Sequence, residues 1–415
     1  MPPTYETMHY LSRYELVNPM EQHGNAERIG KTLTTLEERP KDRLIVSRSG
    51  TAPAWQLFGL ILALMLLIAG RLLGDEPPQF VIFDNDFYGP ASSDLQAAAL
   101  LLTNPSVKVL GLTVVTGDGW RDEETAHTLR LLEILRREDV PVVRGATFPL
   151  INTQVRQQAW EKSFGLIPWK GVWNTKDGPF PNYKSHGPFE IPTLEEGLPT
   201  LKPSNESAAE FLIRQVRAHP HQVSIISAGP MTNLALAIRL DPEFPSLAKE
   251  LVFMGGYIDA GISKATGNPD FVSDFNLLFD PEAAQIAITA AWPKITSVAD
   301  VTNDPALLFS DEVIRQIGQV KTPLSEYVTK YAEKGVPLWD ELTVGVYLDP
   351  SLITNQKEVL MDVDVSHGPG YGSARIYADS VAPRLGERKV NIVLDVDAKR
   401  FVKTFIKAMQ WEPPK

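Results

Sequence analysis

The sequence predicts an α/β fold in which a single domain, with a largely parallel central sheet flanked by helices, follows one transmembrane helix. Two observations predict this fold. After Pro77-Pro78, short apolar runs alternate with stretches of helical spacing, which is typical of parallel strands covered by helices on both faces. Before that point, residues 55–73 are almost entirely apolar. The composition, 43% hydrophobic and 22% charged, is that of a globular protein and excludes wholesale disorder.

Charge and cysteine content exclude several classes of function. The chain has 40 basic and 51 acidic residues and a formal charge of −11, so it has no basic surplus from which to build a nucleic-acid-binding face. It has no cysteine, which excludes disulfides, zinc–thiolate sites, thiol nucleophiles and iron–sulfur clusters. We therefore expect a small-molecule partner and no nucleic acid.

The N-terminal part predicts a membrane attachment. Residues 1–53 carry seven basic and seven acidic residues without a sustained apolar period, so we expect a disordered tail. Residues 54–74 contain the run WQLFGLILALMLLIAGRLL, which is close to the about 20 apolar residues that cross a bilayer. A buried core helix seldom lacks a polar face for so long. A cleaved signal peptide fits less well because a long tail precedes the run. We predict a transmembrane signal anchor.

The flanking charges predict its orientation. Acidic residues, Asp75 and Glu76, follow the apolar run, and basic residues precede it at Arg39, Lys41, Arg43 and Arg48. By the positive-inside rule the N-terminus is cytosolic and residues 75–415 are lumenal or extracellular. The sequon at 205–207 is compatible with that side.

The folded part, residues 75–415, reads as alternating strands and helices. Strands are predicted at 79–84, 107–115, 140–145, 223–228, 250–256, 294–299 and 391–397. Helices are predicted at 92–102, 122–137, 206–218, 231–240, 281–290 and the C-terminus, with mostly helical sequence from 300 to about 349. The Trp-, Pro- and Gly-rich stretch 146–204 has no clear period. It is too long for an idle connection, so we expect it to cover a site.

Carboxylates and amides collect where the predicted strands end. In a parallel sheet ligands bind beyond these ends, and four acids, Asp84, Asp86, Asp94 and Asp118, fall there. A single Asp in such a place is more often a helix cap or turn former, but four at one edge favour a site. Oxygen ligands without lysine, histidine or cysteine suit Ca²⁺ or Mg²⁺. A hydroxyl-rich ligand, a sugar or a nucleoside, complements them.

From Gln79 to the C-terminus the chain resembles the inosine-uridine preferring nucleoside hydrolase family. The residues that carry the resemblance are the DxD at the end of the first strand, GPMTNLALAI (229–238), VFMGG (252–256) and GN-x5-DFN-x3-DPEAA (267–284). The resemblance implies a Ca²⁺-dependent hydrolase (a nucleosidase) that cleaves the N-glycosidic bond of a nucleoside to give free base and ribose. It also implies a possible homo-oligomer.

The resemblance further implies which residues hold the metal. The family signature D-x-D-x-G-x-D-D reads DNDFYGPASSD here, three residues longer. Carried across, Asp84 is structural and Asp86 and Asp94 are Ca²⁺ ligands, together with the main-chain carbonyl of Ala228 and the carboxylate of Asp340. Asp86 is also the candidate general base for an oxocarbenium-like glycosidic cleavage.

Substrate contacts follow from the same comparison, with departures. The substrate-binding positions implied are Ser93, Asp118, Asn268, Asp274, Asn276 and Trp339. Ser93 stands where the family has an Asp, Asp118 where it has an Asn, and Asp274 where it has a Glu. Trp339 stands where the family has a His that helps to protonate the leaving base in some members, and an indole cannot donate a proton in acid catalysis.

Alternatives from other classes stay open at this point. A nucleoside or sugar receptor on the same fold would fit the departures at Ser93 and Trp339. A type II membrane glycosyltransferase would explain the anchor and the DxD but not GPMTNLALAI. A phosphatase with a D-x-D after its first strand wants a small residue where Tyr88 stands. The tryptophans Trp120, Trp160, Trp169 and Trp173 could either pack internally or stack on a ligand.

Overall fold

A computed structural model describes residues 78–167, 169–174, 185–257 and 274–414 of the chain. The predicted tail, the predicted transmembrane anchor and Asn268 lie outside these ranges. Within them, no helix has both the length and the apolar character needed to cross a bilayer.

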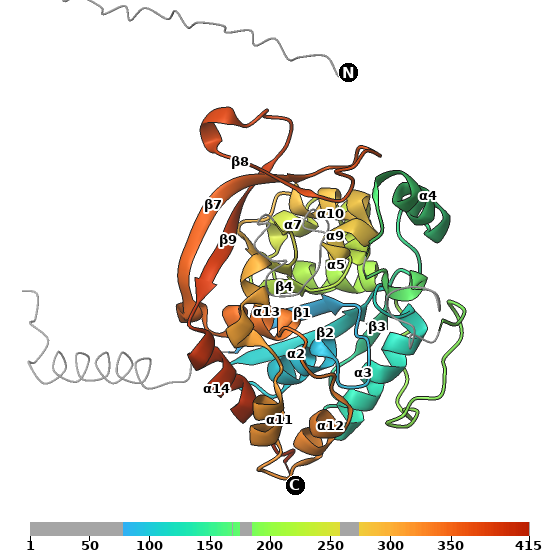
Figure 1. Ribbon diagram of the computed structural model, residues 1–415, viewed down its shortest axis with the longest axis vertical. Helices are drawn as coiled ribbons and strands as arrows, with labels where there is room; N and C mark the ends of the chain where they lie inside the picture. The colour runs from blue at the N-terminus through green and yellow to red at the C-terminus, as the bar shows by residue number, and fades with distance from the viewer. Residues whose placement is uncertain (1–77, 168, 175–184, 258–273, 415) are drawn as a thin grey trace, which may run out of the picture. The chain divides into compact units, whose positions relative to one another are not determined.

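The described residues form a nine-stranded sheet in the order β3-β2-β1-β4-β5-β6-β9-β7-β8 (Figure 1). The strands are β1 (Gln79–Asn85), β2 (Val107–Val114), β3 (Val142–Arg144), β4 (Val223–Ser227), β5 (Glu250–Met254), β6 (Ile295–Val298), β7 (Ile353–Val363), β8 (Ala374–Tyr377) and β9 (Arg388–Val396). Neighbours from β3 to β9 pair in parallel, whereas β7 pairs antiparallel with both β9 and β8. The mostly parallel sheet confirms the predicted α/β domain, whereas the transmembrane helix of the same prediction lies outside the described residues.

Two strands of this sheet, β7 and β8, were not predicted. Most of the first half of β7 is exposed and carries the polar run TNQKE, so it lacks the apolar alternation by which a strand is recognised. Its position is set by the antiparallel ladder with β9, from Ile353↔Val396 to Met361↔Arg388. Long-range pairing, which one sequence segment does not reveal, therefore decides this edge of the sheet.

Helices flank the sheet in the predicted alternation. They are α2 (Ser93–Leu102), α3 (Arg121–Leu135), α4 (Gln154–Phe164), α5 (Ala208–Ala218), α6 (Thr232–Leu240), α7 (Phe244–Leu247), α9 (Phe275–Phe279), α10 (Pro281–Ile288), α11 (Asp311–Ile317), α12 (Pro323–Tyr331), α13 (Trp339–Leu348) and α14 (Ala398–Met409). Short 3₁₀ turns lie at Gly171–Trp173, Asp300–Asn303, Pro305–Leu307, Pro350–Leu352 and Asp379–Val381. The stretch 146–204, predicted to be irregular, thus contains α4 and one 3₁₀ turn.

The core consists of two apolar layers, one on each face of the sheet. Along β1, Val81 and Phe83 join the layer formed with α2, α3 and α11 to α14, whereas Ile82 between them joins the layer formed with α5, α6 and α10. This alternation is the period of two expected of a strand. Each fully buried side chain of this size contributes about 1.5–3 kcal/mol, so both helix layers are firmly held to the strands that carry the polar ends.

The order of the strands places a crevice at β1. From β1 the chain adds β2 and β3 on one side, and later β4, β5 and β6 on the other. At such a switch point the connections leave β1 and β4 in opposite directions, which opens a crevice at their carboxyl ends. Asp86 directly follows β1 and Ala228 directly follows β4, so both lie at the switch point, and both are buried.

Candidate active site

Asp84 braces the floor of the crevice. Its buried carboxylate accepts hydrogen bonds from Thr113 Oγ1 of β2 at 2.5 Å and from Asn233 Nδ2 of α6 at 2.8 Å. Asn233 Oδ1 also accepts the N–H of Ala146 at 2.8 Å, so one amide joins β1 to the loop after β3. Burial raises the pKa of Asp84 to about 7 against the opposing effect of these hydrogen bonds. These contacts agree with a structural role.

The carboxylate of Asp86 fits between two glycines. Asp86 is 2% exposed, and its Oδ2 accepts the N–H of Asp118 at 2.9 Å. A Cβ atom at Gly117 or at Gly229 would overlap this carboxylate. The two glycines belong to the loops after β2 and β4, so both neighbours of β1 are shaped to admit Asp86.

Asp94 and Asp340 meet beside Asp86. They stand in the first turns of α2 and α13, respectively, and both are buried. The amide of Asn85 donates to Asp340 Oδ2 at 2.8 Å and to Asp94 Oδ1 at 3.3 Å. The structure therefore brings together Asp86, Asp94 and Asp340, which lie up to 254 positions apart in the sequence.

The electrostatics of this group are those of mutually repelling acids. Burial, followed by the charges of Asp118, Asp94 and Asp340, raises the pKa of Asp86 well above its usual range. Burial is also the largest cause of the raised pKa values of Asp94 and Asp340. Burial and the charge of Asp94 raise the pKa of Asp118 to about 8. Their hydrogen-bond donors are neutral groups: the side chains of Asn85, Ser92 and Trp169 and main-chain N–H groups.

The donor set fits a hard divalent cation, because such an ion prefers carboxylate oxygens and would offset their repulsion. In the described part of the chain, however, no three side chains of the His, Asp or Glu type are spaced to ligate one ion directly. The amide nitrogen of Asn85 lies between Asp94 and Asp340 instead. The chemistry of the donors, rather than their present spacing, supports a metal.

Ser93 is held by an acid that the sequence reasoning missed. Its hydroxyl donates to Glu341 Oε2 at 2.5 Å and accepts the N–H of Asp340 at 3.2 Å. Glu341 is 1% exposed, and burial raises its pKa to about 8. The only local signal for Glu341 in the sequence is its place directly after Asp340.

Two of the implied ribose contacts are used to build the neighbouring loop. Asn276 donates to the carbonyl of Ala228 at 2.5 Å and to that of Met254 at 3.3 Å. Asp274 caps α9 by accepting the N–H of Leu277 at 3.2 Å, and burial raises its pKa to about 7. The structure thus brings Asn276 to Ala228 and gives Asp274 a capping role.

Trp339 is turned toward a polar group of the protein. It is the first residue of α13, is partly buried against the core, and donates its indole N–H to Asn303 Oδ1 at 3.2 Å. Asn303 also hydrogen-bonds the partly buried Tyr257. Neither Asn303 nor Tyr257 was singled out in the sequence, because nothing in their local pattern distinguishes them.

Part of the tryptophan-rich stretch docks onto the loop after β2. Trp169 donates its indole N–H to Asp118 Oδ1, and Val172 donates its N–H to Gly117 O at 3.0 Å. Gly171 adopts φ +51°, and a Cβ there would overlap the carbonyl of Gly117. The other three tryptophans named above pack against other side chains. Trp120 and Trp173 are buried in a cluster with Phe279, and Trp160 is partly buried against the cluster that contains Ile167. This part of the stretch therefore contacts the predicted site at Asp118 and Gly117, and its role as a cover stays a prediction.

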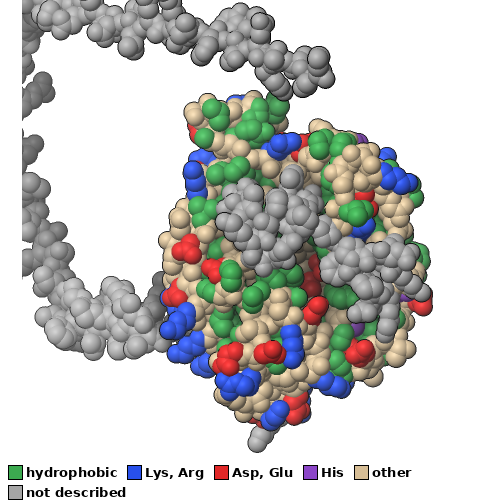
Figure 2. Space-filling model, in the orientation of Figure 1, with side chains coloured by type: hydrophobic (Ala, Val, Ile, Leu, Met, Phe, Trp, Pro, Cys, Tyr) green, Lys and Arg blue, Asp and Glu red, His purple; other side chains and the backbone are tan. Residues whose placement is uncertain are grey.

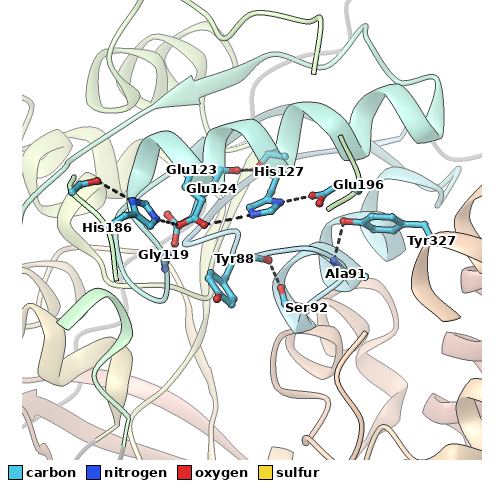
Figure 3. Close-up of polar contacts among 12 residues, drawn as sticks. Tyr88, Ala91, Ser92, Gly119, Glu123, Glu124, His127, His186, Glu196 and Tyr327 are labelled. Atoms are coloured by element: carbon cyan, nitrogen blue, oxygen red, sulfur yellow. Dashed lines mark hydrogen bonds and ion pairs between the residues drawn. The ribbon is translucent and has the colours of Figure 1, made fainter. Parts of the chain in front are cut away.

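A histidine–carboxylate cluster holds the loops on the α3 side of the site (Figure 3). His127 is buried, with Nδ1 on Glu196 Oε1 and Nε2 4.0 Å from Glu123 Oε1. Glu123 Oε2 lies 2.8 Å from His186 Nε2. Its neighbour Glu124 accepts the N–H of Gly119 at 2.7 Å. The cluster joins α3 to the loop after β2 and to the segments around residues 186 and 196.

The sequence profile described as inosine-uridine preferring nucleoside hydrolase matches residues 81–403, which is most of the described domain. The chain belongs to this family. It is accordingly a hydrolase that acts on N-glycosyl compounds, with a nucleoside as its small-molecule substrate.

Individual relatives agree with this family assignment. The nucleoside hydrolase is 31% identical over 340 residues to an uncharacterized protein of Schizosaccharomyces pombe, covering 77% of this chain and 82% of that one. It is 30% identical over 287 residues to the probable uridine nucleosidase 2 of Arabidopsis thaliana, covering 66% and 79% of the two chains. A solved plant nucleoside hydrolase shares the fold, with a TM-score of 0.62 at 23% identity over 80% of this chain and 99% of that one.

Proposed function

We propose that this nucleoside hydrolase is Ca²⁺-dependent and cleaves the N-ribosyl bond of ribonucleosides to free base and ribose. The observation that carries the proposal is the convergence of Asp86, Asp94 and Asp340 at the switch point of the sheet, where the donors found among the described residues are neutral groups. Buried carboxylates in this density are costly unless a cation joins them.

Four groups would hold the ion: the carboxylates of Asp86, Asp94 and Asp340 and the main-chain carbonyl of Ala228. The hydrogen bond from Asn276 to Ala228 O at 2.5 Å would keep that carbonyl in place. Bound Ca²⁺ would supply a fixed positive charge that orients the attacking water and the ribose hydroxyls and lowers the pKa of the water.

Asp86 acts as the general base. Its Oδ2 is held by the N–H of Asp118, and the absence of a Cβ at Gly117 and at Gly229 leaves the room that the carboxylate occupies. In this position Asp86 accepts the proton of the water that attacks the anomeric carbon, and the carboxylates around it stabilise the positive charge of the oxocarbenium-like transition state.

Asn268, Asp274 and Asn276 are assigned to the hydroxyls of the ribose, and Asp118 is assigned to a position beside the sugar. The assignment of Asn268 rests on the family resemblance alone, because this residue lies outside the described ranges. Trp339 cannot act as the acid, so the leaving base departs with help from another donor or from solvent, and its partly exposed ring offers a stacking surface.

Residues 54–74 attach the hydrolase to a membrane, with the N-terminus in the cytosol and residues 75–415 in a lumen or outside the cell. The proposal rests on the apolar run and the basic residues that precede it. It makes the substrate an extracytosolic nucleoside.

The test is hydrolysis by the purified full-length chain in detergent. A panel of purine and pyrimidine nucleosides is incubated with Ca²⁺ or with EDTA, and free base and ribose are measured. We expect release that is abolished by EDTA and by Asp86→Ala. Asp139→Ala is the matched control, because this acid is exposed and pairs with Arg137 on the surface.

Two other outcomes would reject the proposal. A Ca²⁺-dependent thermal shift with a nucleoside but no product would identify a receptor, which the engagement of Ser93 by Glu341 and of Trp339 by Asn303 would then explain. No shift and no product would reject the Ca²⁺-dependent cleavage of ribonucleosides and leave only the family assignment.

A further inference from the structure

Ser93, which departs from the family pattern, contacts Glu341, which directly follows the predicted metal ligand Asp340. Ser93 opens α2 and Glu341 lies in the first turn of α13, 248 positions later, yet the Ser93 hydroxyl donates to Glu341 Oε2 at 2.5 Å. The Ser93 oxygen also accepts the N–H of Asp340 at 3.2 Å. One hydroxyl is therefore bonded twice to the first turn of α13.

These two bonds tie together the turns that carry the proposed metal ligands. Asp94 directly follows Ser93, and Asp340 directly precedes Glu341. A shift of α13 along or around its axis would have to break the Ser93 bonds. The same shift would change the distance between the carboxylates of Asp94 and Asp340, which Asn85 bridges with hydrogen bonds of 3.3 and 2.8 Å.

Burial makes the connection rigid. Glu341 is 1% exposed and Asp340 is 5% exposed, and the two helices pack against each other through the same core layer. Loss of one partner would leave a buried polar group without its bond, which is more costly than the bond itself is favourable. The surrounding side chains therefore keep the carboxyl group of Glu341 within hydrogen-bond distance of Ser93.

We infer that Glu341 is a positioning residue which, through Ser93, holds the first turn of α13, and with it Asp340, in place beside Asp94, and so determines how tightly these acids bind a cation. The inference rests on the proposed function and deepens it, because it assigns a role in the site to an acid that the family pattern does not supply. Glu341 acts by hydrogen bonding, and neither Glu341 nor Ser93 needs to touch the substrate.

The test is a double-mutant cycle read by Ca²⁺ binding without substrate. Isothermal titration of the full-length chain in detergent gives the Kd for Ca²⁺ of the wild type, Glu341→Ala, Ser93→Ala and the double variant. We expect each single variant to bind Ca²⁺ about 10-fold more weakly, as for the loss of one buried hydrogen bond. The double variant should be no weaker than either single one, because the two residues act as one unit.

Two further variants separate positioning from general damage. Glu341→Gln keeps a side-chain oxygen that can accept from Ser93, so it should restore Ca²⁺ binding to within about 2-fold of the wild type. Glu326→Ala removes an exposed acid from the first turn of α12 and should leave Ca²⁺ binding and unfolding temperature unchanged. In variants that bind Ca²⁺ more weakly, kcat measured at saturating Ca²⁺ should recover.

The other possible results either overturn the inference or support it. Wild-type Ca²⁺ binding in Glu341→Ala, additive losses in the double variant, or no rescue by Gln would overturn the inference while leaving the hydrolase intact. A wild-type chain that hydrolyses nucleosides only with Ca²⁺ and shows these losses supports both. A wild type that neither binds Ca²⁺ nor releases product would overturn the proposed function and the inference with it.

Discussion

At the scale of single residues, the site depends on the absence of side chains as much as on their presence. Asp86 occupies space that a Cβ atom at Gly117 or Gly229 would fill. The carboxylate is thereby brought to within 2.9 Å of the N–H of Asp118, deep in the crevice between β1 and its neighbours. Gly117 is thus as important to the geometry of the base as Asp86 itself.

Gly117→Ala should lower kcat at least about 100-fold, because displacing a general base by about 1 Å has an effect of that size. The measurement is nucleoside hydrolysis at saturating substrate, with circular dichroism to check the fold. Gly187→Ala is the control, since a Cβ at Gly187 meets nothing within 4 Å. Full activity in Gly117→Ala would show that Asp86 is not held in the way described.

The residue scale also shows how far sequence reasoning reaches. Asp86 and Asp94 could be predicted because a strand end and a helix start fix their place, and the predicted Asp340 joins them in the structure. Asn85 and Glu341 were not predicted, because their partners lie 255 and 248 positions away; for Glu341 the only local signal was its place directly after Asp340. Asp274 shows the converse: its spacing fits a sugar ligand, but its carboxylate caps α9.

At the scale of elements, the β1–α2 connection and α3 are held together by the cluster around His127. A Cβ at Gly89 would overlap the His127 ring, so this ring packs directly on the connection after β1. On the other side of that connection, Tyr327 of α12 accepts the N–H of Ala91 at 2.8 Å (Figure 3). The longer connection, DNDFYGPASSD, is therefore fitted between α3 and α12.

His127→Ala should lower the free energy of unfolding by about 2–4 kcal/mol, because it opens a cavity and leaves the buried carboxyl of Glu196 without its partner. Chemical denaturation measures this loss. Glu312→Ala breaks an exposed ion pair with Arg315 on α11 and should lower the same free energy by less than about 1 kcal/mol. Equal losses in the two variants would contradict the structural importance of the cluster.

The elements predicted best are those whose apolar period is local. The seven strands predicted, among them 79–84 and 223–228, are all present, since buried parallel strands read as continuous apolar runs. The strands β7 and β8 were not predicted, because many of their residues are polar or exposed and show no apolar alternation. They are strands because they pair with each other and with β9 in the sheet. The docking of Trp169 to Asp118 likewise depends on a fold-back that no local pattern encodes.

At the scale of the whole molecule, buried acids make stability depend on pH. Burial raises the pKa of Asp84 to about 7, of Asp280 to about 6 and of Asp118 to about 8. In the unfolded chain the same groups lose their protons near pH 4. Acidic and basic side chains are interspersed on the face of the molecule that Figure 2 shows.

The sign of the pH effect follows from these values. A folded-state pKa above the unfolded one favours folding below about pH 4, and this contribution is lost as the pH rises toward 8. Without metal, the unfolding temperature should therefore fall from pH 5 to pH 8. Surface acids with a lowered pKa, such as Glu133 with a pKa of about 2, act below this window. Asp84→Asn should reduce the slope, and a flat profile in EDTA would contradict the argument.

The predicted membrane segment and the sequon together allow the proposed placement of the chain in the cell to be tested. If residues 54–74 span a membrane with the N-terminus in the cytosol, the sequon at Asn205 enters the lumen during synthesis. Asn205 is exposed just before α5, so a glycosyltransferase can reach it. In a eukaryotic host we expect a glycosidase-sensitive increase in mass that Asn205→Gln abolishes. Deletion of residues 54–74 should abolish it as well, because the domain then stays in the cytosol. An unmodified full-length chain whose domain is digested by protease added to the cytosolic side would reverse the proposed orientation.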